Sequence, residues 1–359
     1  MKIKRKIPLF FIISLSLFLL TSLLVIVARA SRVAADLLTE TLGTAYRRFF
    51  AFISDPVPFS VFEIVVVLIP FLLALIIFLA VRAFKRGEGR VRLILFLLGC
   101  VCLLLSAYNV SMGTAYHTTP LSDRLDIEEC EVNADSLAVS MQILCEKVNA
   151  IAPTLEYTDG VSEKELSLDA MSERICQAYA LFSERHNFPK SFDSVAKGMV
   201  ASPVMSLLGL TGIYTFYTGE ANVNLTYPTF DVAFTTAHEL SHQRGILREN
   251  EANFMAFLVL YESSDDYLRY AAALTMLEYV GYALYKTDEA KYREIMSTLD
   301  LRARSDLAAS SEVSKKYGGT ILADISDFFN DLFLKSNGTE GIVSYGMVVA
   351  LAVSYLVGE

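Results

Sequence analysis

The stretch TTAHELSHQRGILRENEANF, residues 235–254, contains the pattern H-E-x-x-H, formed by His238, Glu239 and His242. Residues four apart lie one turn above each other on the same face of a helix. Two imidazoles placed in this way can bind one Zn²⁺, and the intervening Glu239 can act on a water molecule as general base. The stretch therefore predicts a zinc site on a helix.

A zinc site needs a third protein ligand, and the sequence offers Glu249 and Glu251. A continuous helix would carry Glu249 about 10 Å beyond His242, at ~1.5 Å rise per residue, whereas a Zn–O bond is about 2 Å long. The helix must therefore stop between them. Gly245 is the expected turn, because glycine tolerates the left-handed backbone that ends many helices. A second helix beginning near Arg248 would then bring a carboxylate back towards the metal.

Glu249 and Asn253 are four residues apart, so they share a helix face. Asn253 can therefore orient a ligand histidine without binding the metal itself. The segment Glu249-Asn-Glu-Ala-Asn253 resembles the E-x-x-A-[DN] helix that supplies the third ligand in several gluzincin peptidases. The resemblance implies that Glu249 is the ligand and Glu251 the runner-up. The spacing departs from most gluzincins, in which the glutamate lies much further downstream.

A wider resemblance covers nearly the whole chain. A hydrophobic amino-terminal region is followed by TGEANVN at 218–224 and by AHELSHQRG at 237–245. In these features the chain resembles an uncharacterised bacterial membrane family, domain of unknown function 3810. The resemblance implies a zinc-peptidase-like membrane protein and brings no known substrate.

Residues 200–228 contain little charge and are rich in Gly, Thr, Tyr and Asn, which indicates extended segments around a turn. The edge strand of a sheet can pair with an extended peptide. By analogy with H-E-x-x-H peptidases, Ala221 to Asn224 are the candidate substrate edge. On this hypothesis Glu220 binds a substrate amino group and Asn222 a backbone carbonyl. The alternative is an ordinary hairpin that covers the active helix.

The composition predicts membrane spans: 53% of the 359 residues are hydrophobic, and the mean hydropathy is +0.42. Apolar runs cover about 7–28, 59–83 and 93–112, each long enough to cross a bilayer. We therefore expect a membrane domain over 1–112. The rival interpretation of the first run is a cleaved signal peptide, but its apolar core exceeds the usual ~7–15 residues.

Positive charge is concentrated on one side of these spans. Nine Lys and Arg residues lie at the amino terminus and in the 82–92 turn, against four in the opposite loop. The nine are Lys2, Lys4, Arg5, Lys6, Arg82, Lys85, Arg86, Arg90 and Arg92. Since positive loops stay in the cytoplasm, the amino terminus is expected to be cytoplasmic. The metal motif is then expected outside the cytoplasm, in a multi-pass protein of the cell membrane.

Residues 113–359 are long enough to form one globular domain, and their pattern is mostly helical. The apolar stretch 342–357 is shorter than the ~17–25 residues of a membrane helix, so we expect a buried helix rather than a fourth span. The predicted fold is mainly α: three amino-terminal transmembrane helices, then a mostly helical, zincin-like extracytoplasmic domain with a small β element. The formal charge of −9 argues against nucleic acid as a partner.

Two functions are compatible with these patterns. The first is a membrane-anchored, zinc-dependent metallopeptidase that hydrolyses peptide bonds outside the cytoplasm, with peptide or protein substrates and membrane lipid as partners. The second is a non-catalytic membrane protein that uses the metal site for structure, sensing, or binding of a cell-wall fragment or a partner. An open coordination position that faces solvent would favour the first.

Overall fold

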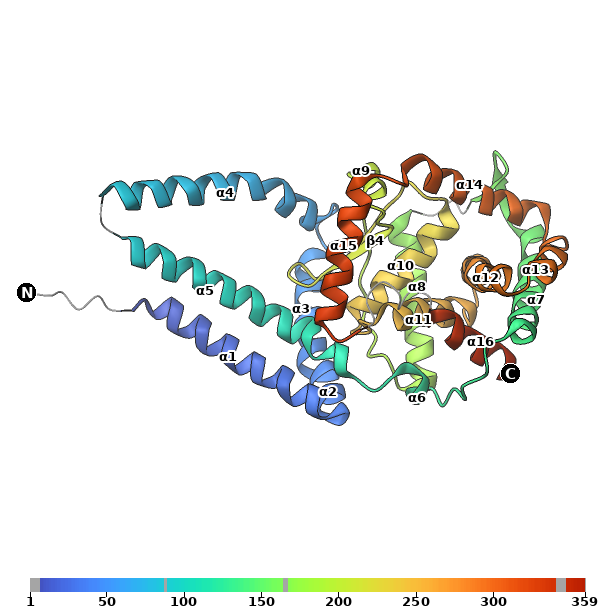
Figure 1. Ribbon diagram of the computed structural model, residues 1–359, viewed down its shortest axis with the longest axis horizontal. Coiled ribbons are helices and arrows are strands. Elements are labelled where there is room, and N and C mark those ends of the chain that lie inside the picture. Colours follow the sequence, from blue (N-terminus) through green and yellow to red (C-terminus); the bar gives the residue numbers. More distant parts are fainter. Residues whose placement is uncertain (1–6, 87–88, 164–166, 340–346, 359) are drawn as a thin grey trace, which may run out of the picture. The chain divides into compact units, whose positions relative to one another are not determined.

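The computed structural model describes residues 7–86, 89–163, 167–339 and 347–358, and the chain is mostly helical (Figure 1). It divides into two compact units. Unit 1 contains residues 1–118 and 215–219, and unit 2 contains residues 119–214 and 220–359.

Unit 1 is built around three long apolar helices, α1 (Leu9–Ala30), α4 (Val61–Arg86) and α5 (Arg90–Tyr108). The segments Leu9–Ala30, Val61–Arg86 and Arg90–His117 are each long and apolar enough to cross a membrane. The 22 residues of α1 extend about 33 Å as a helix, close to the ~30 Å hydrocarbon core. The prediction of three apolar helices near the amino terminus that can span a membrane is confirmed.

The remaining helical segments of unit 1 are short. They are α2 (Arg32–Leu38), η1 (Thr39–Gly43), α3 (Thr44–Ser54), η2 (Asn109–Gly113) and η3 (Ala115–His117). Arg47 of α3 is fully buried and donates hydrogen bonds to the carbonyls of Ser111 at 2.7 Å and Thr39 at 2.9 Å. These bonds connect η1 to η2, two π-helical turns whose wider spacing frees backbone groups for such contacts.

Unit 2 contains most of the elements. The first are α6 (Leu121–Arg124), α7 (Ala134–Ile151), η4 (Ala152–Thr154), β1 (Glu156–Thr158), β2 (Val161–Glu163), α8 (Leu168–His186), β3 (Lys197–Gly198) and α9 (Ser202–Leu207). They are followed by β4 (Gly212–Thr215), β5 (Glu220–Val223), α10 (Thr229–Gln243), α11 (Glu249–Tyr261) and α12 (Asp266–Thr287). The last are α13 (Glu289–Met296), α14 (Leu301–Tyr317), α15 (Ile321–Ser336) and α16 (Val348–Gly358).

The core of unit 2 lies around α11. Every residue from Glu251 to Leu260 is buried. From Phe254 onward the helix is apolar on all sides, as expected for a helix in the core. It packs against α8, α10, α12 and α16, while α7 packs against α12 and α16. The buried side chains of α16 include Val348 and Val353. The described part of 342–357 is thus a buried helix, as predicted, and residues 342–346 lie outside the described residues.

Unit 2 also contains a small β element. β1 and β2 form an antiparallel hairpin, and a second sheet has the order β3-β5-β4. Within it β5 pairs with β3 in parallel, with Lys197 opposite Asn222 and Gly198 opposite Val223. Since α10 packs on β5, this sheet lies beside the helix that carries the H-E-x-x-H motif.

Candidate metal centre

The chain reverses direction just after the H-E-x-x-H helix. Gly245 has φ +93°, and the Ile246 N–H donates back to the Ser241 carbonyl at 3.1 Å. A left-handed glycine followed by this backward bond is a common way for a helix to end. The next helix, α11, begins at Glu249. The structure therefore has the predicted turn at Gly245, without which Glu249 would lie too far from His242 to bind the same metal ion.

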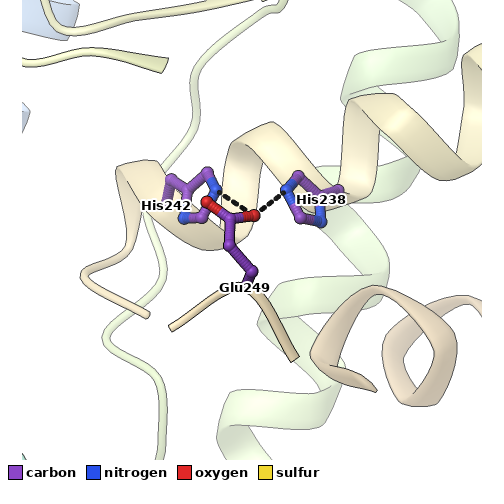
Figure 2. A group of neighbouring side chains, drawn as sticks. All are labelled: His238, His242 and Glu249. Atoms are coloured by element: carbon purple, nitrogen blue, oxygen red, sulfur yellow. Dashed lines mark ion pairs between the residues drawn. The ribbon is translucent and has the colours of Figure 1, made fainter. Parts of the chain in front are cut away.

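This turn brings the three predicted metal ligands together (Figure 2). Glu249 Oε2 lies 3.3 Å from His238 Nε2 and 3.6 Å from His242 Nε2. Ligand atoms of all three residues lie within 4.8 Å of one another. Two ligand atoms bound at ~2.0–2.1 Å with tetrahedral angles are separated by about 3.4 Å. The spacing therefore fits such an ion, and the cluster can hold a metal.

Hydrogen bonds prepare one imidazole for this role. His242 Nδ1 lies 2.8 Å from the Ile246 carbonyl oxygen. Because a carbonyl only accepts, Nδ1 carries a proton, so that Nε2, which faces Glu249, is the nitrogen that would bind a metal. Nδ1 of His238 is buried and has no hydrogen-bond partner among the described residues.

The charges of the cluster are strongly coupled. Burial opposes ionisation of Glu249, but the neighbouring imidazoles hold its pKa below the ordinary value. Burial alone would lower the pKa of His242, yet the Glu249 carboxylate outweighs it and raises that pKa to about 9. The carboxylate and imidazole thus hold a proton between them, and a bound cation would take its place.

Glu239 lies in a buried site beside β4. Its side chain is 4% exposed, and Oε2 has no hydrogen-bond partner among the described residues. Burial raises its pKa, because a charged carboxylate loses hydration there. A Cβ added at Gly212 would lie 2.4 Å from Glu239 Oε1, so only glycine leaves room for this carboxylate. The backbone of Tyr214 adds a hydrogen bond to it.

The other polar residues of the motif fix the helix in the core. Ser241 Oγ lies 2.5 Å from the hydroxyl of Tyr179, which also donates to the Ala237 carbonyl at 2.8 Å. Arg244 stacks over the Tyr179 ring at 4.2 Å and donates to the Phe192 carbonyl at 2.8 Å. The sequence contains no signal for Tyr179, because it lies on α8, far upstream of the motif.

The two candidate glutamates, Glu249 and Glu251, have different partners in the structure. Glu251 Oε1 accepts hydrogen bonds from Arg248 at 2.5 Å and from the Leu121 N–H at 3.1 Å. Its carboxylate is therefore used within the fold, whereas Glu249 belongs to the cluster of possible ligands. Asn253 is buried, and its Nδ2 has no partner among the described residues. The Ile246 carbonyl, and not Asn253, orients His242.

The predicted substrate edge requires a correction. β5, which contains Ala221, lies between β3 and β4 and is not an edge strand. Glu220, Asn222 and Asn224 are at most 1% exposed. The two asparagines donate instead within the fold, Asn222 to the Ile213 carbonyl at 3.2 Å and Asn224 to the Leu210 carbonyl at 2.9 Å.

β4 is one of the two edge strands of this sheet, and β3 is the other. β4 carries Gly212 and Tyr214, which both approach Glu239. The interpretation of 212–224 as a hairpin beside the helix that carries the H-E-x-x-H motif fits the structure, but the strand that borders the Glu239 carboxylate is β4, the first of the two. Strand order depends on β3, which pairs through only two residues and has no hydrophobic pattern of its own.

Comparison with known proteins identifies a family and no function. A family model described as "Protein of unknown function (DUF3810)" matches residues 39–353. The match includes both units and all three residues of the cluster. No curated protein and no solved structure matches the chain.

Proposed function

This chain belongs to the DUF3810 family, and since that family has no assigned function, we propose one from the site: a membrane-anchored zinc metallopeptidase. It would hydrolyse peptide bonds outside the cytoplasm, in a zincin-like domain formed by unit 2. His238, His242 and Glu249 would hold the zinc, and Glu239 would be the general base.

One observation carries the proposal. Glu249 Oε2 lies at tetrahedral spacing from the two imidazole nitrogens, and ligand atoms of all three residues lie within 4.8 Å of one another. Beside them is a buried carboxylate, Glu239, whose Oε2 has no hydrogen-bond partner among the described residues. Structural zinc sites are usually closed by four protein ligands, often cysteines. Two histidines and one glutamate leave a fourth position open, as catalytic sites do.

Zinc bound there would supply Lewis-acid chemistry, lowering the pKa of water towards ~7 and polarising the scissile carbonyl. Glu239 Oε2 can accept a proton from the attacking water and pass it to the leaving amine. Gly212 and the Tyr214 backbone hold this carboxylate in place.

β4 gives the proposed substrate a place to bind. An extended peptide can pair with an edge strand of a sheet through backbone hydrogen bonds. A peptide aligned with β4 would pass beside Glu239, since Gly212 contacts that carboxylate. We therefore propose that the substrate binds along β4 beside Gly212 and Ile213, in place of residues 221–224.

The location follows from the charge pattern. The positive amino terminus and 82–92 turn favour a cytoplasmic position for that end of the apolar helices. Three spans would then place unit 2 outside the cytoplasm. Its substrates would be peptides or proteins on that side.

The test uses the full-length protein in detergent. Metal analysis measures zinc content, and mass spectrometry measures cleavage of a mixed peptide library. Glu239→Gln should keep stoichiometric zinc and lose cleavage by about 10²–10⁴-fold, whereas Glu249→Ala should lose the zinc. A Glu239→Gln variant with wild-type cleavage would refute the role of Glu239. Wild-type protein that binds zinc but cleaves nothing would favour a structural or sensing site instead.

A further inference from the structure

Helix α15 of unit 2 is labelled in Figure 1. Its side chains expose an apolar stripe. Five apolar residues lie on one face of this helix, because they are spaced four, three, one and three positions apart. They are Ile321, Ile325, Phe328, Phe329 and Leu332. Ile321 is 77% exposed, and the two phenylalanines are 65% and 62% exposed. Two adjacent Phe rings within such a stripe are unusual on a surface that only meets water.

The opposite side of α15 attaches it to unit 2. Leu334 is the one buried residue among those described in this helix. At the amino end the Thr320 hydroxyl donates to the Leu207 carbonyl at 2.5 Å. A Cβ added at Gly209 would lie 3.7 Å from the Cβ of Ala323. The helix is therefore fixed along one side, and the stripe faces outward.

A third side of the helix is acidic. Asp324, Asp327 and Asp331 are spaced three and four residues apart, so they form a row beside the apolar stripe. The only basic residue of α15 is Lys335, which pairs with Asp331 at 2.7 Å. An apolar face beside a charged one is one feature of helices that lie flat in the bilayer interface, but the charged side of α15 is acidic, whereas such helices are commonly rich in Lys and Arg there.

We propose that α15 lies in the membrane interface and inserts Phe328 and Phe329 at the boundary between headgroups and acyl chains. The occupant of the stripe is lipid because the same chain carries three helices able to cross a bilayer. That attachment keeps α15 near lipid at high effective concentration. The acidic row would be repelled by anionic lipid, so the expected surface is one of neutral, zwitterionic headgroups.

The chain contains no tryptophan, so the fluorescence of an introduced tryptophan reports on its own position alone. Phe329→Trp places a single indole in the stripe, and Asp327→Trp places one in the acidic row. Each full-length variant is reconstituted in phosphatidylcholine vesicles with and without brominated acyl chains, which quench indole fluorescence on contact. Phe329→Trp should emit at shorter wavelength and be quenched severalfold more than Asp327→Trp.

The outcomes are distinct. Emission from Phe329→Trp at shorter wavelength without quenching would overturn the proposal, because protein and not lipid would then cover the stripe. Emission typical of water would overturn it as well. If Phe329→Trp does not fold, Leu332→Trp tests the same stripe. Stronger quenching in brominated phosphatidylglycerol than in brominated phosphatidylcholine would overturn the assignment to neutral headgroups.

Discussion

Replacing Gly212 by alanine should displace the proposed general base without removing the metal. The added Cβ would lie 2.4 Å from Glu239 Oε1 and 2.8 Å from its Cδ, whereas ordinary contacts begin near 3.4 Å. Gly212 does not have a positive φ, so alanine adds volume rather than backbone strain. The Glu239 carboxylate, which is 4% exposed, would have to retreat by about 1 Å through packed surroundings.

The size of the effect follows from that displacement. A misplacement of about 1 Å at a reacting group can cost about 10²-fold in rate. Forcing a methyl group into a packed core typically costs about 1–3 kcal/mol of stability. None of the atoms nearest to the added Cβ belongs to a metal ligand, so zinc stoichiometry should stay at the wild-type value.

Three measurements test this expectation: zinc content, the thermal unfolding midpoint, and cleavage of the peptide library. Gly198→Ala is the matched control in the same sheet. Its Cβ would meet the end of Leu225 at 2.6 Å, but Leu225 is 48% exposed and can move aside. Wild-type cleavage by Gly212→Ala would refute the close contact with Glu239 or its role in the reaction.

Three further changes test the surroundings of the site. Glu251→Gln should keep its zinc but lose about 1–3 kcal/mol of stability, because the bond to Arg248 loses its charge; loss of zinc would make Glu251 a ligand. Tyr179→Phe should lower the free energy of unfolding by a similar amount, because Ser241 loses a buried partner. An unchanged thermal unfolding midpoint would show that this bond does not stabilise the fold. Burial raises the pKa of Asp231 to about 7, so the folded protein keeps a proton that the unfolded chain releases above about pH 4. Stability should therefore fall between pH 4 and 7, by up to a few kcal/mol. Asp231→Asn should flatten that slope in thermal melts at pH 4.5 and 7, and an unchanged slope would rule this group out.

The sequence could predict the metal cluster because its determinants are local. The i, i+4 spacing of His238 and His242 is a property of one helix. The turn at Gly245 follows from a bond length and a helical rise. The choice of Glu249 over Glu251 needed the resemblance, since the partners of Glu251 include the Leu121 backbone, more than a hundred residues away.

The parts that could not be predicted depend on distant contacts. The central position of β5 rests on a parallel pairing with β3, a strand of two residues. The support from Tyr179 comes from another helix, where a buried tyrosine looks like any core residue. Hydrophobic periodicity identifies helices well, but it contains no information about which of two neighbouring strands lies at the edge.

The short distance along the chain between the two helices of the cluster affects folding as well as chemistry. All three ligand atoms come from residues 238–249, so a metal ion that joins them closes a very small loop. Loop closure costs more entropy as the loop grows, about 0.6 kcal/mol for each doubling of its length. An ion held by these three residues would therefore link α10 to α11 at a small cost in loop-closure entropy.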